Sequence, residues 1–214
     1  MPELNNSGMG LSEKQVQILE VAEKLFAENG FDGTSVRQIS KEAGINVAMI
    51  SYYFGSKKKM LEALLNHRMS DFKIQLESIL LKDITYPEKV DEIVAFVVMR
   101  VHKNRRTYKI INFEYSKNSR SINFEKYLQQ KDENYKVIEA FVKKGQKEGF
   151  FSKKVNIPLI VPTIMGTYFH FYYNKKFHTS LHKLTNEISL DKFVRTTLTK
   201  HIQQTIKALL IYAN

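Results

Sequence analysis

Two short amphipathic segments, each ended by glycine, constrain the first third of this 214-residue chain more than any other feature. Ser35-Val-Arg-Gln38 is a capping box that opens a helix of barely two turns, which Gly44-Ile45-Asn46 ends. A second short helix is expected over about residues 47–54, before Gly55-Ser56. Because isolated helices below about 12–15 residues are marginal in water, tertiary packing must hold both. The preceding segment, opened by the capping box Ser12-Glu-Lys-Gln15, offers an apolar face that can do so.

Helical periodicity continues to the end of the chain, and no stretch shows the sustained alternation of a strand. A fourth helix is expected from near Lys57 to about residue 80. The further expected helices cover about 86–103, 106–116, 122–146, 158–174 and 190–212, with residues 178–189 as a connection. The sequence therefore predicts an all-α protein, with a compact three-helix head and a larger helical body.

Composition and motifs argue against most enzyme classes. The chain has no cysteine, which excludes disulfides, thiolate metal sites, Fe–S clusters and cysteine nucleophiles. It also lacks a glycine-rich phosphate loop, a Gly-x-Ser-x-Gly elbow and a His-Glu-x-x-His pair. His178 and His182 are four residues apart, but no third ligand is obvious beside them. We predict no catalytic residues, no metal site and no cofactor.

Two short helices joined by a glycine turn and braced by a third form the helix-turn-helix arrangement, whose second helix enters the DNA major groove. In the expected second helix, Ile50 and Phe54 are spaced to face inward. Its outer positions carry small, apolar and aromatic side chains where a solvated helix shows Glu and Lys. Between residues 36 and 59 five basic side chains stand against one acidic side chain, although residues 1–60 are neutral overall. The net charge of +11 lies entirely beyond residue 60 and fits nucleic acid, an anionic ligand or a membrane surface.

A plainer interpretation remains open for this segment. The aromatic residues 52–54 would then be core residues, and Lys57–Lys59 a solvated first turn. Three lysines at a helix N-terminus are unfavourable with the helix dipole, however, and DNA phosphates would supply a reason for them.

The run from Ile18 to Asn46, continued from Ser51 to Leu61, resembles the N-terminal domain of TetR/AcrR-family regulators over about residues 11–65. The resemblance implies a homodimeric helix-turn-helix repressor whose C-terminal helices bind an inducer. It assigns residues 1–56 to the DNA-binding domain and residues 57–214 to a helical ligand-binding and dimerisation domain.

The same resemblance implies roles for individual residues. Those that approach bases would be Arg37, Val47, Ala48, Met49, Ser51 and Tyr52. Those that hold phosphates would be Thr34, Ser35, Tyr53 and Lys57. Ser51 stands where many members have tyrosine, and Val47-Ala48-Met49 is neutral where many have Lys-Gly-Thr-like residues. These departures concern the operator sequence more than DNA binding itself.

The body carries fewer signals. An apolar stripe with i, i+3/i+4 spacing runs along the last helix; its members are Leu190, Phe193, Val194, Thr197, Leu198, His201, Ile202, Thr205, Ile206 and Leu209. It is either an internal core helix or, as the resemblance implies, one of two helices per subunit that form a dimeric four-helix bundle. The apolar residues 157–173 are too short and too interrupted to span a membrane. Candidate lining residues of a ligand pocket are Phe96, Met99, Phe113, Tyr115, Tyr168 and Tyr172.

The sequence thus predicts a cytoplasmic, dimeric transcriptional repressor that binds a palindromic double-stranded operator and is released by a small-molecule inducer. The cytoplasmic location is expected because the N-terminus lacks the pattern of a signal peptide. Two alternatives remain: an activator of the same family, or a helical small-molecule-binding or protein-interaction protein without sequence-specific DNA binding.

Overall fold

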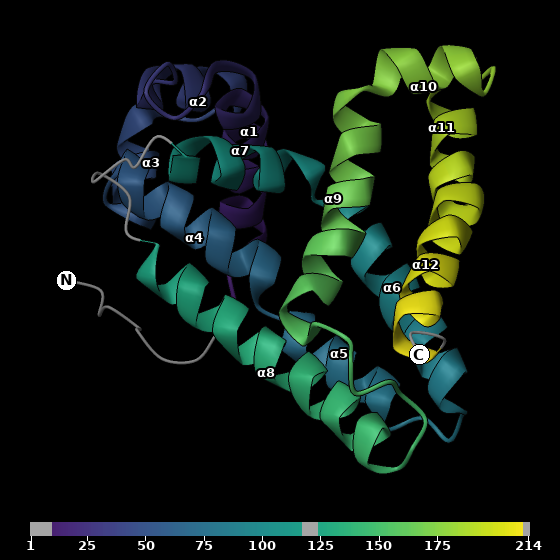
Figure 1. Ribbon diagram of the computed structural model, residues 1–214. Helices are drawn as coiled ribbons and strands as arrows, with labels where there is room; N and C mark the ends of the chain where they lie inside the picture. Colours follow the sequence, from purple (N-terminus) through teal and green to yellow (C-terminus); the bar gives the residue numbers. More distant parts are fainter. Residues whose placement is uncertain (1–9, 117–123, 212–214) are drawn as a thin grey trace. The chain divides into compact units, whose positions relative to one another are not determined.

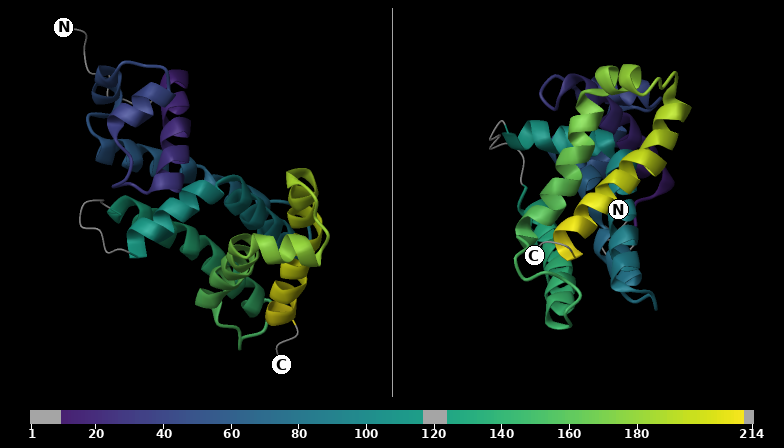
Figure 2. Two further views of the ribbon diagram at one scale, coloured as in Figure 1. Left: turned by 90° about the horizontal axis from the view of Figure 1, so that it is seen from above. Right: turned by 45° about the vertical axis from the view of Figure 1, so that its right-hand side comes forward.

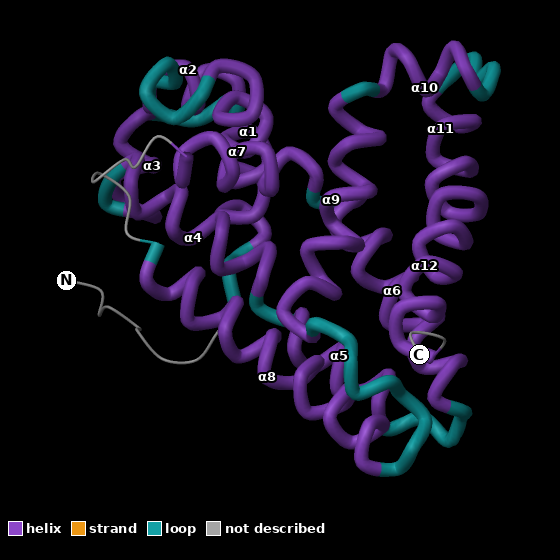
Figure 3. The backbone as a smooth tube through the Cα atoms, in the orientation of Figure 1, coloured by secondary structure: helices purple, strands orange, loops and turns teal. Residues whose placement is uncertain are grey.

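The computed structural model describes residues 10–116 and 124–211, and every regular element within these ranges is helical (Figures 1 and 3). The first seven helices are α1 Glu13–Asn29, α2 Val36–Glu42, α3 Val47–Phe54, α4 Lys57–Met69, α5 Phe72–Leu80, α6 Tyr86–Lys103 and α7 Arg105–Ser116. The remaining helices are α8 Glu125–Lys147, α9 Ile160–Tyr173, α10 Lys175–Leu181, α11 Glu187–Phe193 and α12 Thr199–Ile211. The prediction of an all-α fold is confirmed.

These helices form two compact units. One comprises the first 70 residues together with 105–128, and the other comprises 71–104 together with 129–214. Helix α4 lies in the same unit as α1–α3, and α8 contributes to both units. The predicted functional division at residues 56/57 stays a prediction.

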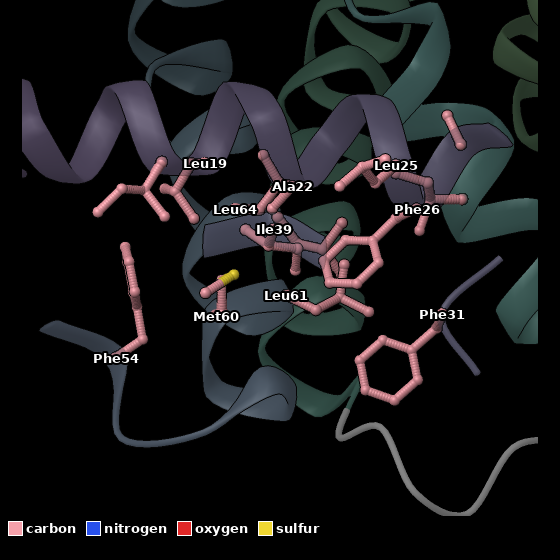
Figure 4. Close-up of a cluster of buried hydrophobic side chains, with 14 of the residues drawn as sticks. Leu19, Ala22, Leu25, Phe26, Phe31, Ile39, Phe54, Met60, Leu61 and Leu64 are labelled. Carbon is pink, nitrogen blue, oxygen red and sulfur yellow. The ribbon is translucent and has the colours of Figure 1, made fainter. Parts of the chain in front are cut away.

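The core of the first unit is built around one face of α1 (Figure 4). Leu19, Ala22 and Phe26 of α1 are almost completely buried. The other helices add the buried side chains Ile39, Ile50, Phe54, Met60, Leu61 and Leu64. The two short helices are therefore held by packing on α1 and α4, as their length requires.

Both predicted capping boxes are present. The Ser12 and Ser35 hydroxyls accept hydrogen bonds from the backbone N–H of Gln15 and Gln38, and the two glutamine side chains accept from the serine N–H groups in return. These bonds satisfy backbone donors that a helix start otherwise leaves free, so they fix where α1 and α2 begin.

The predicted single helix from Lys57 to residue 80 is wrong. The chain breaks at Ser70 and Asp71, and α5 begins at Phe72. The Asp71 carboxylate accepts hydrogen bonds from Gln75 Nε2 and from the Arg100 guanidinium, which holds its pKa below the ordinary value. Because the apolar pattern continues across the break, periodicity alone does not reveal it.

The second unit contains an antiparallel pair, α9 and the C-terminal helical segment, joined through α10 (Figures 1 and 2). The C-terminal segment begins at Glu187 and contains a π-helical stretch, Val194–Leu198, before α12. Helix α10 occupies part of the predicted connection at 178–189. The valines and isoleucines of α6 pack between these helices and form the core.

Two glycines of the second unit provide a matched stability test. A Cβ on Gly145 of α8 would lie 2.2 Å from Cδ2 of the buried Phe151 ring, whereas a Cβ on the exposed Gly166 of α9 has no neighbour within 4 Å. We expect Gly145→Ala to lower the free energy of unfolding by about 1–3 kcal/mol through overpacking. Gly166→Ala should raise it by about 0.5–1 kcal/mol through helix propensity. Urea denaturation checks both, and an equal effect of the two substitutions would contradict the packing at Phe151.

Candidate nucleic-acid interface

A short turn between α2 and α3 sets the angle of the second helix. Gly44 adopts a φ of +63°, a conformation that side chains disfavour, and Ile45 N–H donates to the Ser40 carbonyl over 2.9 Å. The Asn46 side chain then accepts from Ala48 N–H, also over 2.9 Å, and caps α3. These two bonds fix the turn on both sides of Asn46, so α3 starts at a defined residue.

Packing decides which face of α3 is free. Ile50 and Phe54 are buried against α1, α2 and α4, as their i, i+4 spacing predicts. The exposed residues on the helix are Val47, Ala48, Ser51 and Tyr52. Tyr52 is 78% exposed and Val47 is 41% exposed, so the described part of the chain leaves much of both residues uncovered. Because residues i, i+3 and i+4 share a helix face, these four form one surface, which we call the α3 reading face.

Met49 and Tyr53 lie at the margin of the α3 reading face and are half-buried. The Tyr53 ring packs on the core and contacts the Tyr52 ring edge to face, with centroids 5.1 Å apart. The Tyr53 ring thus lies between the core and the Tyr52 ring.

The two helices that pack against α3 carry exposed positive charge. The exposed cations on α2 and at the start of α4 are Arg37, Lys41, Lys58 and Lys59. Glu42, the acidic residue of this segment, is paired with Lys24 of α1 at 2.7 Å, and its pKa is lowered mainly by that hydrogen bond. The charge of the Glu42 carboxylate is therefore balanced by Lys24, while the four cations remain exposed.

Three of the residues predicted to hold phosphates have side chains engaged within the unit. The Thr34 hydroxyl is buried and donates to the carbonyl oxygens of Leu25 and Gly30. The Lys57 ammonium donates to the carbonyl oxygens of Phe31 and Thr34, each at 2.8 Å.

The Lys57 ammonium also lies 4.3 Å from the centroid of the Phe31 ring. The third of these residues is Ser35, whose hydroxyl caps α2 but stays exposed. Thr34 and Lys57 therefore hold the turn between α1 and α2, and a phosphate contact by either stays a prediction.

The lysines at the start of α4 have different expected roles: Lys57 stabilises the fold, whereas Lys58 and Lys59 are exposed and free to contact DNA. We expect Lys57→Ala to lower the free energy of unfolding by about 1–3 kcal/mol, because two carbonyl groups lose a charged donor. Replacing Lys58 and Lys59 together by alanine should leave stability unchanged and reduce the slope of log affinity for DNA against log salt by about two per protomer. Urea denaturation and DNA titrations at several salt concentrations measure the two effects. The opposite assignment, a stable Lys57→Ala with a flattened salt slope, would contradict the structure.

The six candidate ligand-pocket residues are distributed over both compact units. Phe113 and Tyr115 are exposed residues of the first unit. Tyr168 is completely buried in the second unit, where its hydroxyl lies 2.9 Å from Nδ1 of His102. Tyr172 stacks on Tyr168, and Phe96 packs against Phe72. Their role as ligand contacts, together with that of Met99, stays a prediction.

The described ranges, 10–116 and 124–211, contain neither a metal cluster nor a membrane-spanning helix. No three histidine, aspartate or glutamate side chains there are placed to share a metal ion. No helix in the same ranges combines the length and the apolarity needed to cross a bilayer.

Comparison with known proteins shows that this segment is similar to transcriptional regulators. The family model described as "Bacterial regulatory proteins, tetR family" matches residues 18–64, the segment that contains α2, the turn and α3. The transcriptional repressor NicS of Pseudomonas putida is 29% identical over 172 residues, which is 76% of each chain. YttP of Bacillus subtilis, named as an HTH-type transcriptional regulator, is 31% identical over 136 residues, 62% of this chain and 64% of that protein.

The likeness extends to the fold of the body. The structure of the ketosteroid transcriptional regulator KstR2 of Mycobacterium tuberculosis covers 94% of this chain and 97% of its own, with a TM-score of 0.68 and 18% identity. The matched family model and the two relatives are all named as transcriptional regulators, and none of them is named as an enzyme. Residues 18–64 therefore match the tetR family, and over a longer stretch the chain is similar to the two regulators above.

Proposed function

We propose that this protein is a dimeric repressor that binds a palindromic operator through the α3 reading face and is released by a small-molecule inducer. The observation that carries the proposal is the α3 reading face itself: an exposed, uncharged helix surface between α2 and α4, whose exposed cations are Arg37, Lys41, Lys58 and Lys59. Small and apolar groups fit against thymine methyls, Ser51 and Tyr52 offer hydroxyls, and the cations suit the phosphates on either side. The named repressor NicS supports the direction of regulation.

The dimer contact is proposed on α9 and α12. On α12 the stripe residues Ile202 and Ile206 are buried within the chain's own core, whereas His201 and Leu209 remain exposed. The exposed face of α9 contains Pro162 and Gly166. A second copy would cover these faces as a four-helix bundle, and two heads would then reach successive major grooves about 34 Å apart.

Release by an inducer requires a ligand that binds one arrangement of the dimer more tightly than the other. Helix α4 starts two residues after α3 and is linked to α5 of the second unit through Ser70 and Asp71. A ligand in the second unit can therefore act on the heads through α4. Regulation of this kind places the protein in the cytoplasm, with the chromosome.

Selection of bound duplexes from a random DNA pool at near-physiological salt tests the proposal. The expected result is a consensus of two inverted half-sites about one helical turn apart. Retention of DNA without a consensus would leave charge-driven binding alone and would contradict the proposal. An absence of retention by protein that mass spectrometry shows to be free of ligand would favour a helical binding protein without sequence-specific DNA recognition.

A further inference from the structure

A groove of about 490 Å³ lies on the second unit between α5, α6 and α8. Its volume is within the range of sites for small organic molecules. It is lined by Lys73, Glu77, Leu80, Tyr86, Lys89, Glu133, Lys136, Val137, Ala140, Phe141 and Lys144. A second cavity, of about 20 Å³, lies in the core among ten apolar side chains, and it has room for no organic ligand.

The floor of the groove is apolar. Leu80 of α5 and Val137, Ala140 and Phe141 of α8 supply aliphatic and aromatic surface. Tyr86 stacks on Phe141, with ring centroids 5.6 Å apart, and donates its hydroxyl hydrogen to Glu148. Burial and this carboxylate raise the pKa of Tyr86 to about 12, so the phenol stays neutral at physiological pH. The floor therefore suits an uncharged hydrocarbon chain.

The rim carries four lysines against two glutamates. Lys73 and Lys144 lie 3.9 Å from Glu133 and Glu148, which is beyond hydrogen-bond distance. Lys136 is paired with Asp132 on its own helix at 2.7 Å.

Lys89, the fourth lysine, donates to the Leu80 carbonyl. Each ammonium has three donors, so these contacts leave most of the donor capacity of the rim open.

We propose that this groove binds an amphipathic organic anion, with its hydrocarbon chain on the Phe141 floor and its carboxylate or phosphate head between Lys73, Lys136 and Lys144. Charge complementarity at the rim and the apolar floor together select this class over an uncharged lipid or a small inorganic anion. That such a ligand is also the inducer rests on the proposed function, whereas its binding does not.

Calorimetric titration of the full chain without DNA tests the groove directly. The probes are decanoate, decyl phosphate and decanol, each below its micelle concentration. We expect one decanoate per chain and at least about tenfold weaker binding of decanol, which has the same chain and no charge. Tighter binding of decyl phosphate than of decanoate would identify a phosphate head, and the reverse order a carboxylate. Equal binding of decanoate and decanol, or no binding of any probe, would overturn the proposal.

Helix α8 offers matched variants for the rim. Lys136→Gln with Lys144→Gln removes two rim charges, whereas Lys131→Gln with Lys143→Gln removes two exposed charges of the same helix outside the groove. We expect the first pair to weaken decanoate binding about tenfold or more and the second pair to change it less than twofold. An equal effect of the two pairs would show that only net charge matters and would overturn the site.

A substitution at Ala140 tests the apolar floor of the groove separately from the rim. Ala140 is exposed and lines the groove, so Ala140→Phe fills the space without burying a larger side chain in the core. It should weaken decanoate and decyl phosphate alike, and unchanged binding would exclude the chain from this floor. Titration of DNA-bound protein is a separate readout: bound decanoate without DNA release would contradict the inducer role and leave the groove assignment intact.

Discussion

Ala48→Glu is expected to reduce the affinity for the selected operator by at least about 100-fold while the protein remains folded. Ala48 is an exposed residue in the first turn of α3 and belongs to the α3 reading face. An acidic residue in the first turn is compatible with the helix dipole, and the Ala48 backbone N–H keeps its bond to Asn46. In the complex, however, a carboxylate would face phosphates and base acceptors, and like charges at an interface cost several kcal/mol.

The matched control is Gln17→Glu, which adds the same charge at an exposed position of α1 in the same unit. The Lys14 ammonium already donates to the Gln17 side chain, so a carboxylate there keeps its partner. Fluorescence anisotropy with a labelled duplex gives both affinities, and thermal unfolding verifies the fold. If the two variants lost affinity equally, net charge and not the α3 reading face would govern binding.

Arg68→Met is expected to lower the free energy of unfolding by about 3 kcal/mol. Glu23 of α1 is 7% exposed, and its Oε2 accepts from Nη2 and Nε of Arg68 in α4 at 2.6 and 3.2 Å. Its other oxygen accepts from the Thr107 hydroxyl of α7. Removal of the guanidinium leaves a carboxylate with little access to water, and the penalty of an unpaired buried charge is large.

The double variant Glu23→Leu with Arg68→Met separates this cause from lost packing. Apolar residues of similar volume often replace a buried ion pair without loss. The double variant should therefore lose clearly less than the sum of the two single variants, with a remaining loss of about 1–3 kcal/mol because the buried Thr107 hydroxyl loses its acceptor. Urea denaturation of the parent, both single variants and the double variant forms a complete cycle. Additive losses in the double variant would mean that the pair is not coupled.

The head could be predicted from sequence because its signals are local. The capping boxes at Ser12 and Ser35 fix two helix starts, and the spacing of Ile50 and Phe54 shows which side of α3 is buried. Those features involve residues three or four apart, which is the range over which helix periodicity carries information.

The remaining features depend on partners far away in the chain. The Lys57 ammonium finds carbonyl groups 23 and 26 residues before it, so its engagement in the turn is invisible in the local sequence. The break at Ser70 lies inside an unbroken apolar pattern. The groove combines α5, α6 and α8, and its lysines look like ordinary solvated residues until the three helices are placed.

The most direct test of sequence recognition by α3 is a parallel selection of random duplexes with the parent protein and with Tyr52→Ala. Tyr52 is 78% exposed on the α3 reading face, and loss of its side chain leaves the core unchanged. We expect the same half-site spacing for both proteins, with a changed base preference at equivalent positions of the two half-sites. An identical consensus from both proteins would contradict base recognition by Tyr52, and a consensus without two-fold symmetry would contradict the dimeric regulator itself.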